Sequence, residues 1–256
     1  IPFHHIGYAG HKDKRALTEQ YISVKNGTQA LENIKIKDMF LEYVGSGPER
    51  INLGDLDGNS FRIVVRDLDT AEELAITQIK NYFDTQRLGR KNRNALVGKA
   101  LVKRDFATAC DILRLTVEKN DYIGVLLTVG KKQLIFYIHA YQSLLFNHFL
   151  DQYTGEEEII PIVGFVTEFT DKKVETIYNK ILKEEGITLK DFIFNELPEL
   201  SSEGSTRKLY VGVKDFTFLY RDDEYHSGKV KCILKFELPP GAYATMVVKT
   251  LFSKDL

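Results

Sequence analysis

Hydrophobic and polar residues alternate in short runs near both ends of the chain, as is typical of strands. Runs at 3–9 and 20–26 predict two strands on either side of a charged turn. From 230 to 238, apolar residues alternate with Lys and Glu, which predicts a strand with one buried face. Residues 40–44 and 207–219 are further strand candidates. Both ends of the chain are therefore expected to contribute strands.

The middle of the chain has the periodicity of helices. Residues 106–119 and 136–153 show it, and in the second segment apolar side chains form a broad surface. A charged amphipathic helix is expected over 171–185, where Gly186 would end it. An apolar run at 162–166 predicts a strand between these helices.

Two further elements are predicted between the charged turn and the helical middle. Residues 51–66 alternate around the Asp-Gly-Asn sequence at 57–59, which is typical of a β-hairpin. Asp69 or Thr70 can cap a helix that continues through Ile79, because acidic residues in its first turn are favourable. The chain would then pass from a hairpin into a helix.

Composition narrows the class of protein. The chain has 256 residues and is 43% hydrophobic, enough for one large domain or two modest ones. No run of apolar residues is long enough to span a membrane, and there is no signal peptide. Cys110 and Cys232 fit no metal-ligand spacing and suggest buried thiols in a reducing compartment, so a cytoplasmic location is expected. The histidines form no persuasive metal pair, and no metal site is expected.

Charge is balanced overall but not locally. The 35 basic and 36 acidic side chains nearly cancel, so nucleic-acid binding would need a local basic patch. Residues 86–104 supply seven basic side chains and no acid: Arg87, Arg90, Lys91, Arg93, Lys99, Lys103 and Arg104. This stretch suits either a phosphate backbone, with salt-dependent binding, or a solvated helix face.

The charged turn between the two N-terminal strands is the main candidate for chemistry. It places Asp13 among Lys12, Lys14 and Arg15. A carboxylate near core strands is costly unless it is solvated or paired, so a surface turn is the ordinary interpretation. However, residues 10–20 resemble the signature G-x-K-D-K-x-A-x-T-x-Q of the TruD family of RNA pseudouridine synthases.

Further segments resemble the same family, in the same order. Residues 81–89 are similar to its N-Y-F-x-x-Q-R-F-G motif, with Leu88 in place of phenylalanine. Residues 238–245 resemble its closing L-P-x-G-x-[FY]-A-T motif, whereas 53–61 and 140–147 resemble segments between these motifs. Such an order over most of the chain is hard to obtain by accident.

The closing motif departs from the family pattern just after residue 245. Lys249 and Thr250 stand where Arg-Glu is usual. This departure keeps a positive charge at Lys249 but is expected to lose a possible ion pair.

The resemblance implies an α+β fold with two domains. A mixed-sheet pseudouridine synthase catalytic domain would be interrupted by a second α/β domain, the TRUD domain. Mapped onto this sequence, residues 1–93 and 218–256 would form the catalytic domain, with 94–217 inserted. The basic stretch would lie at the hinge and face a cleft for tRNA. The N-terminal part of the catalytic domain is expected to be missing, because the signature follows almost directly after Ile1.

The resemblance also implies an isomerase that converts a uridine of tRNA, expected to be uridine 13 as in bacterial relatives, into pseudouridine. No cofactor or metal would be required. Asp13 would be the catalytic residue, either as a nucleophile or as a base that removes a ribose proton. Lys12, Lys14 or Arg15 would keep it ionised, or a lysine of the N-terminal segment, which approaches this aspartate in relatives. Lys12 and Arg15 are also expected to contact RNA.

The later motifs would hold the nucleotide. Phe83 would stack on the extruded base, and Asn81 would fix the loop or the base edge. Tyr243 would close the pocket, while Gln86 and Arg87 would brace the loop or meet phosphate. The alternative is that the aromatic side chains simply pack inward.

Two other functions stay open. One is a non-catalytic RNA-binding protein that keeps the RNA cleft. The other is an assembly protein whose basic stretch contacts acidic protein surfaces. RNA binding that weakens with salt and yields no product would favour the first, and failure to bind tRNA at any salt concentration would favour the second.

Overall fold

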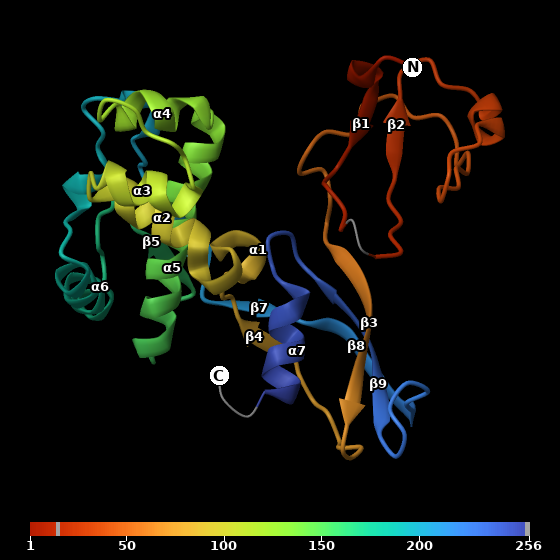
Figure 1. Ribbon diagram of the computed structural model, residues 1–256. Helices are drawn as coiled ribbons and strands as arrows, with labels where there is room; N and C mark the ends of the chain where they lie inside the picture. Colours follow the sequence, from red (N-terminus) through yellow and green to blue (C-terminus); the bar gives the residue numbers. More distant parts are fainter. Residues whose placement is uncertain (14–15, 254–256) are drawn as a thin grey trace. The chain divides into compact units, whose positions relative to one another are not determined.

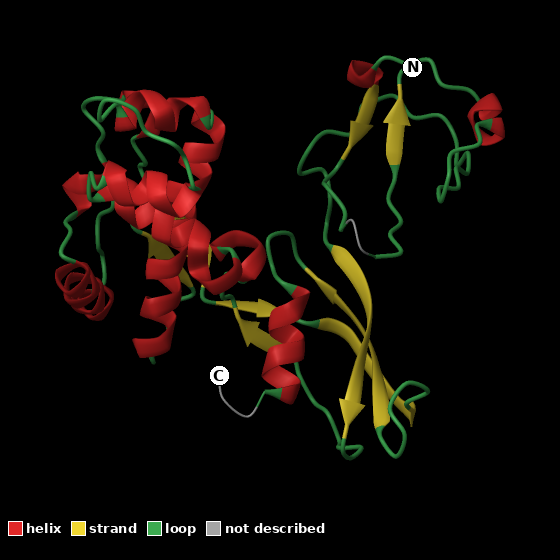
Figure 2. Cartoon of the chain, viewed as in Figure 1, coloured by secondary structure: helices red, strands yellow, loops and turns green. Residues whose placement is uncertain are grey.

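The structure is a computed structural model that describes residues 1–13 and 16–253. These residues fall into two compact units, Ile1–Asn59 and Ser60–Leu256. The fold is α+β, as predicted, with several small sheets and a helical middle (Figure 2).

The first unit is built on a two-stranded antiparallel pair. β1 (Ile6–Tyr8) pairs with β2 (Ile22–Val24), and Gly7 lies opposite Ser23. Two short 3-10 helices flank the pair, η1 (Phe3–His5) and η2 (Gln29–Asn33). The two predicted N-terminal strands are thus confirmed, and the charged turn connects them.

A following segment packs against this pair at Gly7. A Cβ atom at Gly7 would lie 2.3 Å from the carbonyl oxygen of Ile51 and 2.5 Å from Oγ of Ser23, so only glycine fits. Ser23 Oγ accepts a hydrogen bond of 2.9 Å from the Ile51 amide. The amide of Gly54 also donates to the carbonyl of Ala9 over 2.8 Å. The segment from Ile51 to Gly54 therefore covers the hairpin.

Two strand predictions in this part of the chain are wrong. Residues 40–44 form no strand, and 51–66 form no hairpin. β3 (Asn59–Leu68) instead pairs with a strand near the C-terminus. Packing between residues far apart in the sequence supports this pairing, because the ring of Phe61 stacks on Phe236 with 5.5 Å between centroids.

The second unit contains a three-stranded sheet in the order β3-β9-β8 (Figure 1). β8 (Lys214–Asp222) and β9 (Val230–Leu238) are antiparallel, and β9 has the predicted bounds. Cys232, Leu234, Phe236 and Leu238 of β9 are buried and form one hydrophobic core with residues of α7 (Ala244–Phe252). The strand predicted over 230–238 is therefore confirmed, and the closing motif leads from it through a turn at 240–241 into α7.

The second unit also contains two sheets of two strands each. β4 (Gln78–Lys80) pairs with β7 (Tyr210–Gly212), and β5 (Ile159–Ile162) pairs with β6 (Ser205–Lys208). The helix predicted between Asp69 and Ile79 is wrong: residues 71–77 are irregular and lead into β4. Their apolar side chains pack against the core of the three-stranded sheet, which outweighs the local helix signal.

The helical middle surrounds one long buried helix, α5 (Lys131–Gln152), which includes the predicted segment 136–153 up to residue 152. The other helices are α1 (Thr85–Leu88), η3 (Arg90–Asn92), α2 (Arg93–Val102), α3 (Phe106–Leu113), α4 (Tyr122–Thr128), α6 (Lys172–Glu185), η4 (Leu189–Phe192) and η5 (Pro198–Leu200). α6 is capped by Asp171 and ends at Gly186, as predicted. The strand expected at 162–166 lies earlier, as β5.

Buried apolar residues of the second unit form two large clusters. One consists of residues between 97 and 209, and the other of Ile79 together with residues between 211 and 247. Tyr82 packs against both clusters. Cys110 lies in the first cluster and Cys232 in the second, as the buried thiols that were predicted.

Candidate functional site

The loop between β4 and α1 is anchored at Asn81, a buried residue. Its amide group donates to the carbonyl of Lys208 over 3.1 Å, and its backbone amide donates to Leu209 over 2.9 Å. Arg207 donates to the carbonyl oxygen of Asn81 over 2.8 Å and to its Oδ1 over 2.5 Å. The polar atoms of Asn81 are thus engaged within the protein, where they brace the loop.

Phe83 is half-buried at the centre of this loop. The side chain of Asn147 on α5 holds its backbone on both sides, with bonds of 2.9 and 2.8 Å. Its ring meets Phe146 and Tyr243 edge to face, with centroids 5.7 and 6.2 Å away. The guanidinium carbon of Arg207 lies 4.0 Å from the ring centroid. The ring is therefore fixed in orientation, and a cation lies over it.

Asp84 ties the same loop to α7. Its buried carboxylate accepts from Lys249 Nζ over 2.6 Å and from the hydroxyl of Thr245. Burial alone would raise the pKa of Asp84, but the bonds from Lys249 and Thr245 outweigh burial and hold the pKa below its ordinary value. The positive charge that the sequence keeps at Lys249 is thus paired with Asp84.

Tyr243 directly precedes α7 and is half-buried. Burial raises the pKa of its hydroxyl, and the positive charges of Arg207 and Arg87 oppose this rise. Tyr243 therefore belongs to a cluster with Phe83 and two arginine side chains.

Arg87 braces α1 against α5. Its Nε donates to Ser143 Oγ over 3.3 Å, and its guanidinium carbon lies 5.3 Å from the centroid of Phe136. Burial lowers the pKa of Arg87. Burial also lowers the pKa of the nearby His139, and the charge of Arg87 lowers it further. Of the two roles expected for Arg87, bracing is the one for which contacts are present.

Sequence reasoning missed Arg207. It lies on β6, brought beside Asn81 by the fold, and the strand pattern gives no signal that distinguishes it from a solvated arginine. A third bond of 2.9 Å runs from Arg207 to the carbonyl of Gly241. Burial lowers the pKa of Arg207 to about 10, and the charge of Arg87 contributes in the same direction.

The charged turn lies in the first unit. Asp13 is exposed, in the connection between β1 and β2. Lys12 Nζ donates to Oδ1 of Asn59 over 2.9 Å. Lys14 and Arg15 lie outside the described residues. The structure thus gathers Asn81, Phe83, Arg87 and Tyr243 in one cluster of the second unit, whereas Lys12 and Asp13 belong to the first.

Most basic side chains of residues 86–104 bind other groups of the protein. Neither a phosphate contact nor a solvated helix face, the two interpretations of this stretch, predicts these bonds. Lys99 pairs with Glu185 over 2.9 Å, and Lys103 donates to the carbonyl of the same residue over 3.1 Å. Arg104 donates to the carbonyl of Asp191 over 3.0 Å. Arg93 likewise donates to a backbone carbonyl, whereas Arg90, Lys91 and Gln86 are exposed.

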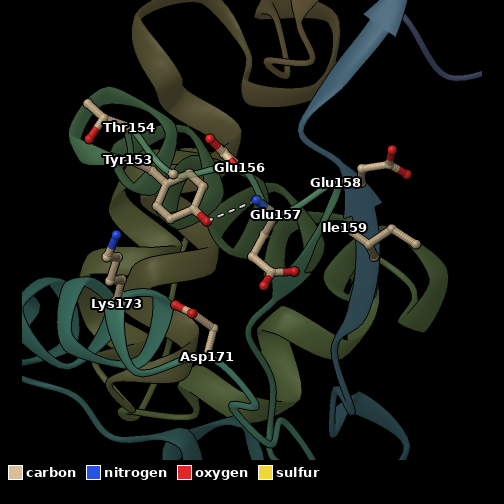
Figure 3. A pocket seen from close by; sticks show the side chains of 9 residues that line it. Tyr153, Thr154, Glu156, Glu157, Glu158, Ile159, Asp171 and Lys173 are labelled. Atoms are coloured by element: carbon tan, nitrogen blue, oxygen red, sulfur yellow. Dashed lines mark hydrogen bonds between the residues drawn. The ribbon is translucent and has the colours of Figure 1, made fainter.

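A hollow of about 720 Å³ lies elsewhere, between the end of α5 and the start of α6 (Figure 3). Four carboxylates and one lysine line it, and the amide of Glu157 donates to the hydroxyl of Tyr153 over 3.2 Å. A surface with this charge repels phosphate. None of the predicted site residues lines it, so it is not a candidate for nucleic-acid binding.

The described residues contain neither a cluster of metal ligands nor a helix suited to span a membrane. Within that part of the chain, no group of three or more His, Cys, Asp or Glu residues is arranged to hold a metal ion. No helix there has the length and apolar character needed to cross a membrane.

Known proteins resemble the chain over most of its length. "Probable tRNA pseudouridine synthase D" of Methanosarcina acetivorans is 28% identical, covering 98% of this chain and 80% of that protein. "tRNA pseudouridine synthase D" of Aquifex aeolicus is 24% identical, covering 100% and 86%. A crystal structure of the putative tRNA pseudouridine synthase D from Methanosarcina mazei superposes with a TM-score of 0.80, at 26% identity and coverage of 98% and 82%.

The sequence model of the family described as "tRNA pseudouridine synthase D (TruD)" matches residues 1–115 and 157–251. These ranges contain the aspartate signature at 10–20 and the motifs at 81–89 and 238–245, whereas residues 140–147 lie outside them. The chain therefore belongs to the TruD family of tRNA pseudouridine synthases, which are isomerases.

Proposed function

We propose that this chain converts uridine 13 of tRNA into pseudouridine and that Asp13 is the catalytic carboxylate. The observation that carries the proposal is the family's aspartate signature at residues 10–20, in a chain that the family model matches. The two strands that flank the signature are paired, so the loop that carries Asp13 is held at both ends while its carboxylate stays exposed.

The reaction needs no co-reactant. The bond between ribose C1′ and base N1 breaks, the base turns, and C5 joins C1′ while the proton on C5 is lost and N1 gains one. The carboxylate of Asp13 either attacks C1′ or removes a ribose proton, and both routes require it to be ionised.

The second unit would hold the nucleotide. An extruded base loses its stacking on neighbouring bases of the RNA, and an aromatic ring of fixed orientation can stack on it instead. Phe83 is such a ring, and Tyr243 lies beside it. Asn81 and Arg87 brace the surrounding loop, and Gln86, Lys12 and Arg15 would meet phosphate.

The proposed domains are 1–93 with 218–256 for the catalytic part and 94–217 for the insertion. The two hydrophobic clusters of the second unit support an insertion, because one is built almost wholly from residues between 97 and 209. The compact unit Ile1–Asn59 would then be a separate portion of the catalytic part.

The test is release of tritium from tRNA labelled at uridine C5, comparing the wild type with Asp13→Asn. Glu19→Gln is the matched control, because Glu19 is an exposed carboxylate of the same connection. We expect release by the wild type and the control and none by Asp13→Asn, with tRNA binding retained in all three.

A second tRNA substrate tests the position of the uridine, and the possible negative outcomes distinguish the alternatives. A tRNA with cytidine at position 13 should release no tritium from the wild type. Full release from that tRNA would overturn the assignment of uridine 13. Binding without release by the wild type would instead indicate the non-catalytic RNA-binding protein, and equal release by Asp13→Asn would mean that another carboxylate acts.

A further inference from the structure

We infer that Arg207 is a positioning residue for this reaction, which fixes the Phe83 ring and places a positive charge behind the base. The inference rests on the proposed function and deepens it. Arg207 comes from β6, far along the chain from the motifs, yet it binds two oxygens of Asn81 and the carbonyl of Gly241. It thereby joins the loop after β4 to the turn before α7.

The charge of Arg207 is unusual within the second unit. Several cations there pair with carboxylates: Arg66 with Asp223, Lys99 with Glu185, and Lys249 with Asp84. In the described part of the chain, no carboxylate forms an ion pair with Arg207, and its hydrogen-bond acceptors are neutral oxygens. Its pKa of about 10 leaves it charged at neutral pH. Burying a cation in this way is costly, so a ligand that carries negative charge would offset the cost.

Arg87 strengthens this argument. It too forms no ion pair with a carboxylate among the described residues, and burial lowers its pKa. The charges of Arg87 and Arg207 both act on Tyr243, the aromatic neighbour of Phe83. Two half-buried cations therefore border the pair of aromatic rings on which the base is proposed to lie.

The reaction supplies a matching negative charge. When the bond between C1′ and N1 breaks, its electron pair stays on the base, and the detached uracil is an anion until C5 bonds to C1′. The guanidinium of Arg207 lies 4.0 Å from the centroid of Phe83, so a base stacked on that ring would lie close to the charge. The attraction is weak for the neutral uridine and strong for the anion, which lowers the barrier rather than the substrate affinity.

The inference is tested with Arg207→Met and Arg207→Lys, and with Arg90→Met as the control at an exposed arginine. We expect Arg207→Met to lower kcat by roughly tenfold to a hundredfold, with KM for tRNA changed by less than threefold. Arg207→Lys should recover part of kcat, because it keeps the charge but not the forked hydrogen bonds. A KM effect alone, or equal losses in both variants with a matching drop in thermal stability, would show a merely structural role.

A second measurement does not depend on turnover. The chain has no tryptophan, so Phe83→Trp introduces a single indole at the proposed platform. We expect tRNA to quench its emission, and we expect Arg207→Met in this background to weaken the quenching. If Arg207→Met weakens the quenching but the wild type releases no tritium, the positioning role is supported and the proposed chemistry is overturned. Quenching that is unchanged by Arg207→Met would overturn the positioning role alone.

Discussion

The side-chain amide of Asn147 binds both backbone polar groups of Phe83. Its Oδ1 accepts from the amide of Phe83 over 2.9 Å, and its Nδ2 donates to the carbonyl over 2.8 Å. The side chain of Asn147 thus supplies one acceptor and one donor to the backbone of Phe83, as the backbone of a neighbouring β-strand would. Through this contact α5 fixes the loop that carries the proposed platform for the base.

Replacing Asn147 with alanine should loosen that loop. We expect a loss of about 1–3 kcal/mol in the free energy of unfolding, because two part-buried backbone groups lose their partners. We also expect kcat/KM for tRNA to fall, since the ring of Phe83 is no longer held. Urea unfolding and the tritium assay measure these effects. Gln152→Ala is the control, at an exposed amide near the end of the same helix; an equal loss there would contradict the special role of Asn147.

The ion pair of Asp84 and Lys249 should respond unequally to the loss of either partner. Lys249→Met leaves a buried carboxylate without its cation and should cost about 3–5 kcal/mol. Asp84→Asn leaves only a lysine that is 42% exposed, and should cost about 1–3 kcal/mol. Chemical unfolding of both variants checks the order, and the reverse order would mean that the carboxylate is stabilised mainly by other groups.

The same pair should make stability depend on pH in the acid range. The pKa of Asp84 in the folded protein lies below its unfolded value of about 3.9, so the folded state favours the ionised form. Its contribution is fully present above about pH 5 and is lost as the pH falls through the folded pKa. We therefore expect the stability difference between wild type and Asp84→Asn to narrow below about pH 4. A difference that stays constant down to pH 3 would contradict this assignment.

Gly98 should tolerate no side chain. A Cβ atom at this position of α2 would lie 1.9 Å from the carbonyl oxygen of Tyr137, so α2 and α5 would have to separate. We expect Gly98→Ala to cost about 3 kcal/mol, at the upper end for overpacking. Gly212→Ala is the control, since the nearest atom to its Cβ is 3.9 Å away. Its unfolding free energy should stay within about 0.5 kcal/mol of the wild type.

Arg104 and Arg90 of the basic stretch should differ in their contribution to the stability of the fold. Arg104 donates to backbone carbonyls of Val102 and Asp191, and its guanidinium carbon lies 3.9 Å from the centroid of Phe194. Arg104→Met should therefore lower stability by about 1–2 kcal/mol and leave the salt dependence of tRNA binding unchanged. Arg90→Met should leave stability unchanged. A reduced salt slope in Arg104→Met with normal stability would show that Arg104 contacts phosphate.

Local patterns predicted several elements because local forces decide them. The alternation over β9 and the capping of α6 by Asp171 and Gly186 place these elements in any compact fold of this chain. The predictions over 51–66 and 69–79 failed because distant packing decided those segments. Phe61 is held by Phe236, and the irregular segment before β4 packs on the sheet rather than forming a helix.

The sequence by itself determined the family, since the motifs that carry it are short and depend on residue identity rather than on contacts. It also singled out Asp13, Phe83 and Tyr243 as candidates. Only the tertiary structure decided which cations lie beside the aromatic pair. A run of basic residues shows how much charge is present but not its partners, so Lys99 and Arg104 suggested RNA contacts and proved to bind α6 and its surroundings. Arg207 gave no signal because its contacts join β6 to segments far from it along the chain.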